Sequence, residues 1–339
     1  MTNEIETIPN PKNFCGGNFQ DWLEVYLTGK CNGKCSFCID KHGFRPDNSI
    51  EPEELVKTII DGGQKNILLL GGEPTLYKGF GYVTRALKEA GRNVTVTTNG
   101  STLSRRNIKQ ALQDVSCVNI SVHHYDLSIN KTITGIGLND DCLYYNSKSL
   151  KDLGVDVRIN CNIIKGYIDS EPEALKFLNW SFFKGIRNVR FAELKNDDRF
   201  VSLASIFKNR YGLNEDPFIL GCWQNADIDG MKVNFRQLCG MQTNKRAAPI
   251  NPKQILKKVL YYDGKLYDGW QSIKEGDMAK DKGKNVSDEE LKTTLKVLLN
   301  QVEEGNLSAD EAANIVFALM KSNIKVVEKV VTTGSGCVY

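Results

Sequence analysis

The sequence lacks the features that would place a chain in a membrane. None of its apolar runs approaches the ~18 residues that a membrane-spanning helix needs. It opens with Met1-Thr2-Asn3-Glu4, a polar and acidic start that is unlike a signal peptide. We therefore expect a cytoplasmic protein that does not associate with membranes. Thiols stay reduced in that compartment, so the ten cysteines are not expected to form a disulfide framework.

The sequence also lacks an excess of either charge. It has 44 basic and 41 acidic residues, for a net charge of +3, so charge gives no indication of nucleic-acid binding. A nucleotide substrate is still compatible with this balance. A hydrophobic content of 41% and a charged content of 25% are ordinary for a globular protein and exclude a disordered chain. A length of 339 residues favours one α/β catalytic domain with an appendage.

One loop stands out from this ordinary background. Cys31, Cys35 and Cys38 lie within eight residues around a glycine, so three thiols can meet at one metal centre. A closed structural zinc site needs four protein ligands, and the nearest candidate for the fourth is His42. On a four-iron cluster, three cysteines leave one iron for a small molecule. The incomplete ligand set favours a catalytic cluster, and the alternative is a zinc-stabilised binding module with structural cysteines.

A second motif follows an apolar strand, where Leu68-Leu69-Leu70 leads into Gly71-Gly72-Glu73-Pro74. The pattern C-x-x-x-C-x-x-C followed by a G-G-E-P turn resembles the radical S-adenosylmethionine (SAM) enzymes over roughly residues 20–195. The resemblance implies a 4Fe–4S cluster on Cys31, Cys35 and Cys38, SAM at its free iron, and an external electron donor of flavodoxin or ferredoxin type.

The resemblance also implies an activity. SAM would be cleaved reductively to a 5′-deoxyadenosyl radical, which abstracts hydrogen from a substrate. No subfamily motif identifies that substrate, so a peptide, a nucleotide and a small metabolite all stay open.

Strands and helices alternate between residues 22 and 194, and four of the five predicted helices end in glycine. The predicted strands cover 22–28, 66–70, 94–99, 118–124, 155–163 and 188–194. The predicted helices cover 49–61, 82–90, 103–113, 143–153 and 172–183. Such alternation predicts a parallel sheet. The expected fold is α/β, a partial (β/α)6 parallel barrel with a C-terminal hairpin region and a small helical appendage.

The alternation stops near residue 195. We expect residues 195–220 to be irregular, and Asp229-Gly230 and Asp263-Gly264 each predict a hairpin. Relatives often place auxiliary-cluster cysteines after the second hairpin, but this chain has Asp268-Gly269-Trp270 there, so Cys222 and Cys239 are not expected to hold a second cluster. The expected division is a lead-in (1–19), a core (20–195), a hairpin-containing extension (196–272) and a helical appendage with a tail (273–339).

The third to fifth predicted strands each carry one apolar and one polar row. Parallel strands that are covered on both faces read as continuous apolar runs, and a closed eight-stranded barrel fills its centre with branched side chains. A polar row turned away from the helices therefore predicts a wet lumen that holds a ligand. The polar row includes Asn119, Ser121, His123, Arg158, Asn160 and Asn162, opposite Val122, Val157, Ile159 and Cys161.

Several residues are candidates for the site. Phe37 either stacks beside the adenine of SAM, as the resemblance implies, or packs under its loop. Gly71 and Gly72 permit close approach of a ligand, while Glu73 either contacts the SAM amino group or braces the turn. His123 is the candidate catalytic residue, a proton donor or acceptor near substrate, or else an ordinary lumen residue. The candidate cofactor-binding residues are Phe37, Gly71, Gly72, Glu73, Pro74, Ser121, Arg158, Asn160 and Asn162.

Overall fold

The computed structural model describes residues 21–38, 50–194, 197–213, 223–237, 258–261 and 264–268, together with Glu303. The predictions made for the lead-in, His42, Cys222, Cys239 and, apart from Glu303, the appendage lie outside these residues.

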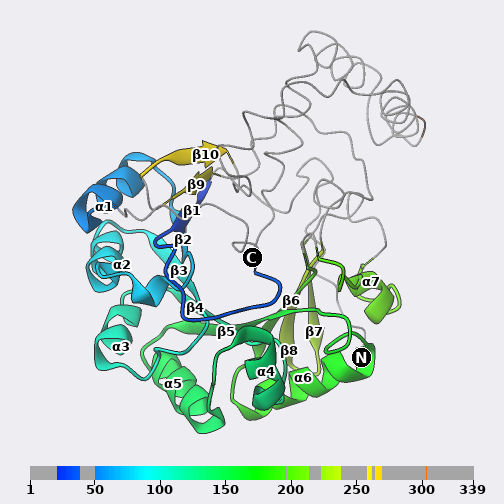
Figure 1. The fold of residues 1–339 in the computed structure, drawn as a ribbon. Helices are drawn as coiled ribbons and strands as arrows, with labels where there is room; N and C mark the ends of the chain where they lie inside the picture. The colour runs from blue at the N-terminus through cyan, green and yellow to red at the C-terminus, as the bar shows by residue number, and fades with distance from the viewer. Residues whose placement is uncertain are drawn as a thin grey trace.

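Six parallel strands form the centre of one curved sheet, and helices lie along its outer side (Figure 1). The strands are β1 (Trp22–Tyr26), β2 (Asn66–Leu70), β3 (Asn93–Thr98), β4 (Cys117–Ser121), β5 (Asp156–Asn162) and β6 (Asn188–Ala192). The helices that connect them are α1 (Pro52–Asp61), α2 (Phe80–Glu89), α3 (Arg106–Leu112), α4 (Leu127–Thr134), α5 (Asp140–Asp152) and α6 (Glu171–Phe183). All six predicted strands and five predicted helices are therefore present, with ends shifted by a few residues.

Two helices differ from the prediction. Helix α4 was not expected, because its sequence is short and rich in polar residues. The side chain of Asp126 caps it by accepting from the backbone N–H groups of Ser128 and Ile129, and Gly135, with φ of 73°, ends it. The stretch 195–220 was expected to be irregular, but its described part contains the short helix α7 (Leu203–Ile206).

Both predicted hairpins are confirmed, and each extends the sheet at one edge. β7 (Trp223–Ile228) and β8 (Met231–Arg236) turn at Asp229 and Gly230, which both have positive φ as a tight hairpin requires. β8 then pairs with β6 in parallel. At the opposite edge, β9 (Lys258–Leu260) pairs with β1, and β10 (Leu266–Asp268) pairs with β9. The order β10-β9-β1-β2-β3-β4-β5-β6-β8-β7 leaves the described sheet open, which confirms a partial barrel.

The two faces of the sheet divide as the alternation predicted. The apolar row lies in one hydrophobic core with the helices and is at most 3% exposed; it includes Val94, Val96, Val118, Ile120, Val122, Val157, Ile159 and Cys161. The opposite face carries polar side chains, among which Asn119 donates to Thr97 Oγ1 at 3.1 Å. The predicted register of these three strands is therefore confirmed.

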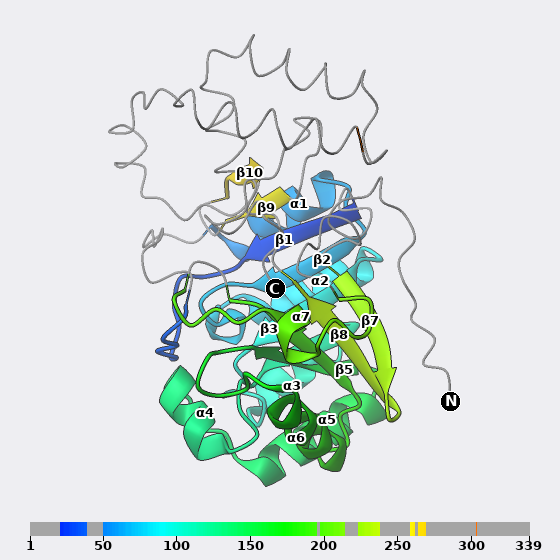
Figure 2. The ribbon, with the colours of Figure 1, turned by 90° about the vertical axis from the view of Figure 1, so that its right-hand side faces the viewer.

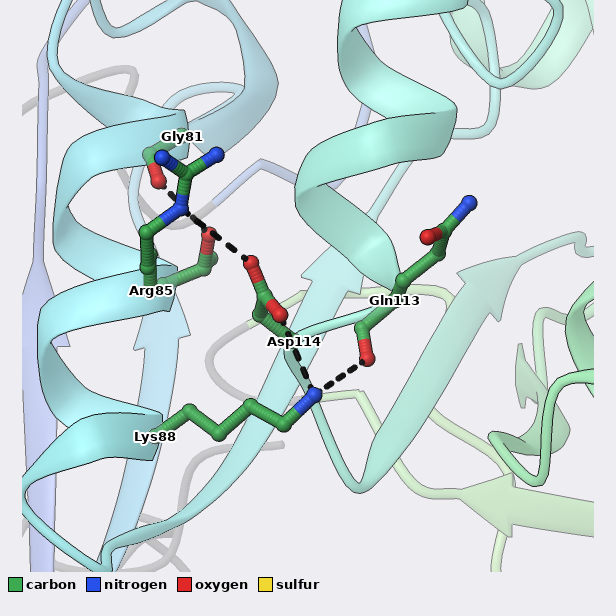
Figure 3. Close-up of polar contacts among 6 residues, drawn as sticks. Gly81, Arg85, Lys88, Gln113 and Asp114 are labelled. Carbon is green, nitrogen blue, oxygen red and sulfur yellow. Dashed lines mark hydrogen bonds and ion pairs between the residues drawn. The ribbon is translucent and has the colours of Figure 1, made fainter.

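The outer surface of the helical layer is tied by ordinary polar contacts (Figure 3). Between α2 and α3, Asp114 forms ion pairs with Lys88 at 3.1 Å and with Arg85 at 3.9 Å. Lys88 also donates to the carbonyl oxygen of Gln113. Such exposed pairs contribute little to stability, so this face offers sites for control substitutions.

No helix within the described residues is long and apolar enough to cross a membrane. Among the cysteines that the structure describes, Cys117, Cys142 and Cys161 are free thiols.

Candidate active site at the carboxyl ends of the strands

The cysteine loop and the glycine turn meet at the carboxyl ends of neighbouring strands. The loop follows β1 and the turn follows β2, and these two strands pair in parallel from Trp22 with Asn66 to Tyr26 with Leu70. Ligands of parallel α/β sheets bind at this end of the strands. The two motifs that carry the family resemblance are therefore brought together.

The cysteine loop is held on two sides. The backbone N–H groups of Lys34 and Ser36 donate to the carbonyl oxygens of Thr134 and Ile133, at 2.7 and 3.1 Å, at the end of α4. On its other side, the loop residue Asn32 accepts a hydrogen bond from the amide of Asn99 at 2.9 Å. Figure 2 shows the blue loop after β1 reaching toward α4. The unexpected helix α4 thus supports the loop.

The thiols of this loop are accessible to a ligand to different degrees. Cys31 is exposed, and Cys35 and Cys38 are partly buried, so the loop opens toward a ligand. Thiolates around one zinc stand about 3.8 Å apart, given Zn–S bonds of about 2.3 Å. Among the described residues, no group of three or more His, Cys, Asp or Glu side chains is close enough to hold a single metal ion. A cubane cluster binds each thiolate to a different iron, so a loop with three cysteines could bind three of its four irons.

The two glycines of the turn lie against the chain's own backbone. A Cβ on Gly72 would lie 2.4 Å from the carbonyl oxygen of Lys30, and a Cβ on Gly71 would lie 2.7 Å from that of Thr28. The backbone N–H of Gly72 donates to Thr28 O at 2.7 Å. These glycines therefore permit close approach of the chain's own backbone after β1, and the approach of a ligand to the same turn stays a prediction.

Glu73 braces the turn. One carboxylate oxygen accepts from the hydroxyl groups of Thr75 and Thr98, at 2.6 and 2.7 Å, and from the backbone N–H of Thr75. The other oxygen accepts from the backbone N–H of Asn99 at 2.7 Å. Burial raises the pKa of this carboxyl, and these hydrogen bonds oppose the rise. Of the two predicted roles, the structure supports the brace, and Pro74 begins the short 3₁₀ helix η3 (Pro74–Leu76) that the carboxylate caps.

Phe37 and His123 pack against each other below the loop. Their ring centroids are 4.7 Å apart at an interplanar angle of 78°. Phe37 also contacts an apolar cluster formed by Ile133, Ile164 and Leu194. The packing role predicted for Phe37 is therefore observed, and this packing fixes the ring beside the cysteine loop.

His123 lies just beyond the end of β4 and is 4% exposed. Its backbone N–H donates to Asn130 Oδ1 on α4 at 2.8 Å, and its Nδ1 accepts from the backbone N–H of Asn162 at 3.0 Å. This acceptor role leaves the ring proton on Nε2. Burial lowers the pKa of His123 to about 3, so the imidazole is neutral near pH 7. Of its predicted roles, donating a hydrogen bond through Nε2 fits this state, whereas a charged imidazolium acid does not.

The other predicted lumen residues lie on neighbouring strands. Ser121 ends β4 and is partly buried, whereas Asn160 and Asn162 on β5 are each 4% exposed. In the register of the sheet, Ser121 lies beside Asn160, and Asn119 lies beside Arg158. The structure thus groups these candidates on one face.

Sequence reasoning missed Arg190, which continues this row on β6. Arg190 on β6 is 5% exposed, and its Nε donates to Asn234 Oδ1 on β8 at 2.7 Å. The signal was present, because Val189 and Phe191 alternate with Arg190 as the rows of the earlier strands do. Sequence reasoning also missed Asn32, which accepts from Asn99 after β3 and stands in no recognisable motif.

Comparison with known proteins agrees with this arrangement. Residues 25–178 match the family model described as "Radical SAM superfamily". The chain is 32% identical over 177 residues to "Probable GTP 3′,8-cyclase" of Saccharolobus islandicus, covering 51% of this chain and 56% of the relative. It is 31% identical over 186 residues to "GTP 3′,8-cyclase" of Petrotoga mobilis, covering 52% and 56%. The chain thus spans little more than half the length of these relatives.

Solved structures show the same fold. The chain resembles Streptococcus suis SuiB bound to S-adenosylmethionine, with a TM-score of 0.53, 18% identity, and coverage of 73% of this chain and 57% of that one. It also resembles SuiB bound to precursor peptide SuiA, with a TM-score of 0.55, 17% identity, and coverage of 78% and 61%. At this identity the likeness concerns the fold alone.

Proposed function

Because this chain belongs to the radical SAM superfamily, we propose that it is an enzyme that cleaves SAM reductively and uses the product radical on a substrate in its lumen. The observation that carries the proposal is the joining of the three-cysteine loop to the glycine turn through Lys30. The N–H of Glu73 donates to that residue's carbonyl oxygen at 2.8 Å, directly before Cys31.

Cys31, Cys35 and Cys38 would hold a 4Fe–4S cluster, and SAM would bind beside it at the strand ends. When bound, these groups supply reductive cleavage of a carbon–sulfur bond and a 5′-deoxyadenosyl radical that abstracts hydrogen from the substrate. The chain itself positions the reactants and keeps water away from them.

The chain's own residues would do this work from fixed positions. Phe37 presents an aromatic surface beside the loop, and its contact with His123 keeps the ring in place. His123 offers a neutral Nε2–H donor, because the Asn162 N–H occupies its other nitrogen. Ser121 and Asn162 end adjacent strands beside it and can donate to or accept from ribose or carboxylate oxygens.

The finer features of the function are also part of this proposal. The superfamily's need for one electron implies a small donor protein of flavodoxin or ferredoxin type, and we place the enzyme in the cytoplasm. The names of the curated relatives make GTP the first substrate to test, and a peptide and a small metabolite are the other classes.

The test is anaerobic reconstitution of the full chain, followed by iron and zinc analysis and by incubation with dithionite and SAM. We expect bound iron and slow formation of 5′-deoxyadenosine and methionine without added substrate. One zinc per chain, with no broad visible absorbance and no SAM cleavage, would instead support the zinc-stabilised binding module. Deuterium-labelled GTP is then added, and 5′-deoxyadenosine is analysed for deuterium. If SAM is cleaved but 5′-deoxyadenosine contains no deuterium, GTP is excluded as the substrate while the assignment to radical SAM enzymes is unaffected.

A further inference from the structure

The middle of β5 carries two polar side chains with buried atoms that lack hydrogen-bond partners. Arg158 and Asn160 alternate with Val157 and Ile159, which lie in the hydrophobic core, so they leave the sheet on the lumen face. Asn160 is 4% exposed, and neither its side-chain oxygen nor its nitrogen has a hydrogen-bond partner. The Nε of Arg158 is also buried without a partner. Buried polar groups are almost always bonded, so such a pair points to an absent ligand.

Other guanidinium groups lie near this pair. Arg190 lies beside Asn160 in the register of β5 and β6, and it is 5% exposed. Burial lowers the pKa of Arg190, the charges of Arg158 and Arg236 lower it further, and Cys117 and Glu24 oppose them. Among the described residues, the guanidinium groups of Arg158, Arg190 and Arg236 lie close enough to influence one another, and the carboxylates of Glu24 and Asp156 act on the same group of residues. Guanidinium groups bind carboxylates and phosphates through paired N–H donors.

These residues lie deeper than the site at the strand ends. Arg158 precedes Asn162 by four residues on one strand, which separates their Cα atoms by about 13 Å. Asn160 lies between them, about 7 Å below Asn162. The cysteine loop, the glycine turn and His123 all belong to the strand-end level. A ligand at Arg158 therefore lies below the position in which the Cys31 loop and Phe37 would hold SAM.

We propose that Arg158 and Asn160, with Arg190 beside them, form a subsite in the lumen for an anionic group of the substrate, a carboxylate or a phosphate. This inference rests on the proposed function, because it assigns the part of the substrate that lies away from the reacting centre. It differs from the sequence-based prediction that Arg158 and Asn160 bind SAM itself.

The test measures anion binding to the reconstituted full chain by calorimetry at constant ionic strength. The probes are inorganic pyrophosphate and succinate, and the variants are Arg158→Gln, Arg158→Lys and Asn160→Ala. The matched control is Arg85→Gln on the outer face of α2, where the arginine side chain is 71% exposed (Figure 3). We expect one probe to bind the unaltered protein and Arg85→Gln equally, and at least tenfold more weakly when Arg158 becomes Gln. Tighter binding of pyrophosphate identifies a phosphate group, and tighter binding of succinate identifies a carboxylate.

Three outcomes would overturn the inference. The first is that neither probe binds the unaltered protein. The second is that Arg85→Gln weakens probe binding as much as Arg158→Gln does. The third is that the Arg158 and Asn160 variants lose SAM affinity while their affinity for the probe is unchanged. If Arg158→Gln does not fold, the inference is tested with Arg158→Lys and Asn160→Ala, because both are expected to weaken probe binding by severalfold. SAM cleavage without substrate is measured in parallel. Cleavage without anion binding defeats only this inference, and anion binding without cleavage defeats only the proposed function.

Discussion

The carbonyl oxygen of Lys30 accepts a hydrogen bond from the backbone N–H of Glu73 at 2.8 Å, which fastens the glycine turn to the residue before Cys31. The contact is possible because residue 72 is a glycine, since a Cβ at this position would collide with that carbonyl oxygen. The turn is thus part of the support for the cysteine loop. A side chain added to the glycine turn is therefore expected to displace Cys31.

We therefore expect Gly72→Ala to lower iron content as well as SAM affinity. The added methyl group would lie 2.4 Å from Lys30 O, which is backbone and yields only if the loop shifts. Gly81→Ala, in α2, is the matched control, because its Cβ would meet nothing closer than 3.6 Å and alanine favours a helix. Iron per chain and SAM affinity are measured after identical reconstitution. Full iron content with weakened SAM binding in Gly72→Ala would show that the turn serves the ligand alone.

The three cysteines give a second prediction. Replacement of Cys31, Cys35 or Cys38 by Ala should abolish a brown chromophore that otherwise corresponds to about four irons per chain. Cys142→Ala is the control, because this free thiol is exposed on α5 and belongs to no site described here. About eight irons in the unaltered protein would mean that the expectation of no second cluster is wrong and that Cys222 and Cys239 are ligands.

Local patterns in the sequence were enough to predict the strands, the hairpins and the faces of β3 to β5. Alternation of apolar and polar residues has a physical cause in the two-residue repeat of a strand, so Val157 and Arg158 could be assigned to opposite faces. The contacts of Gly72 and Glu73 could not be predicted. They depend on the approach of two strands that lie far apart in the sequence. The G-G-E-P motif is also equally compatible with a contact to a ligand and with a contact to the protein backbone.

Helix α4 illustrates the other limit. It has eight residues, and its polar sequence gives little apolar periodicity, so packing and its Asp126 cap decide its formation. Because the prediction missed it, it also missed that Asn130 fixes His123 and that Thr134 supports the cysteine loop. Arg190 was missed for a simpler reason, since the alternation was not extended to β6.

His123 gives a prediction about pH. Burial lowers its pKa from the usual 6.5 to about 3, so between these values the unfolded chain takes up a proton that the folded protein does not. Stability is therefore lost as pH falls through 6.5. Lowering the pH from 7.5 to 5.5 should cost about 1.4 kcal/mol of unfolding free energy from this residue.

The measurement compares urea unfolding of the unaltered protein and of His123→Gln at both pH values. The variant should be less stable at pH 7.5, because His123 Nδ1 no longer accepts from Asn162, but its stability should depend less on pH. An equal pH dependence in both proteins would contradict the buried, neutral state of His123.

The two faces of the sheet give the last prediction. Val157→Ala removes methyl groups from the core behind β5, where the side chain is 3% exposed, and the remaining cavity should lower the unfolding free energy by about 1 to 3 kcal/mol. SAM cleavage per folded molecule should stay near its original rate, because this side chain faces the helices.

Ser121→Ala, at the lumen end of β4, should change stability by less than about 0.5 kcal/mol while it weakens SAM binding. Unfolding curves and SAM titrations of both variants are needed. A one-residue shift of register exchanges the faces of a strand, so loss of SAM binding in Val157→Ala together with unfolding of Ser121→Ala would show that the lumen face has been assigned to the wrong residues.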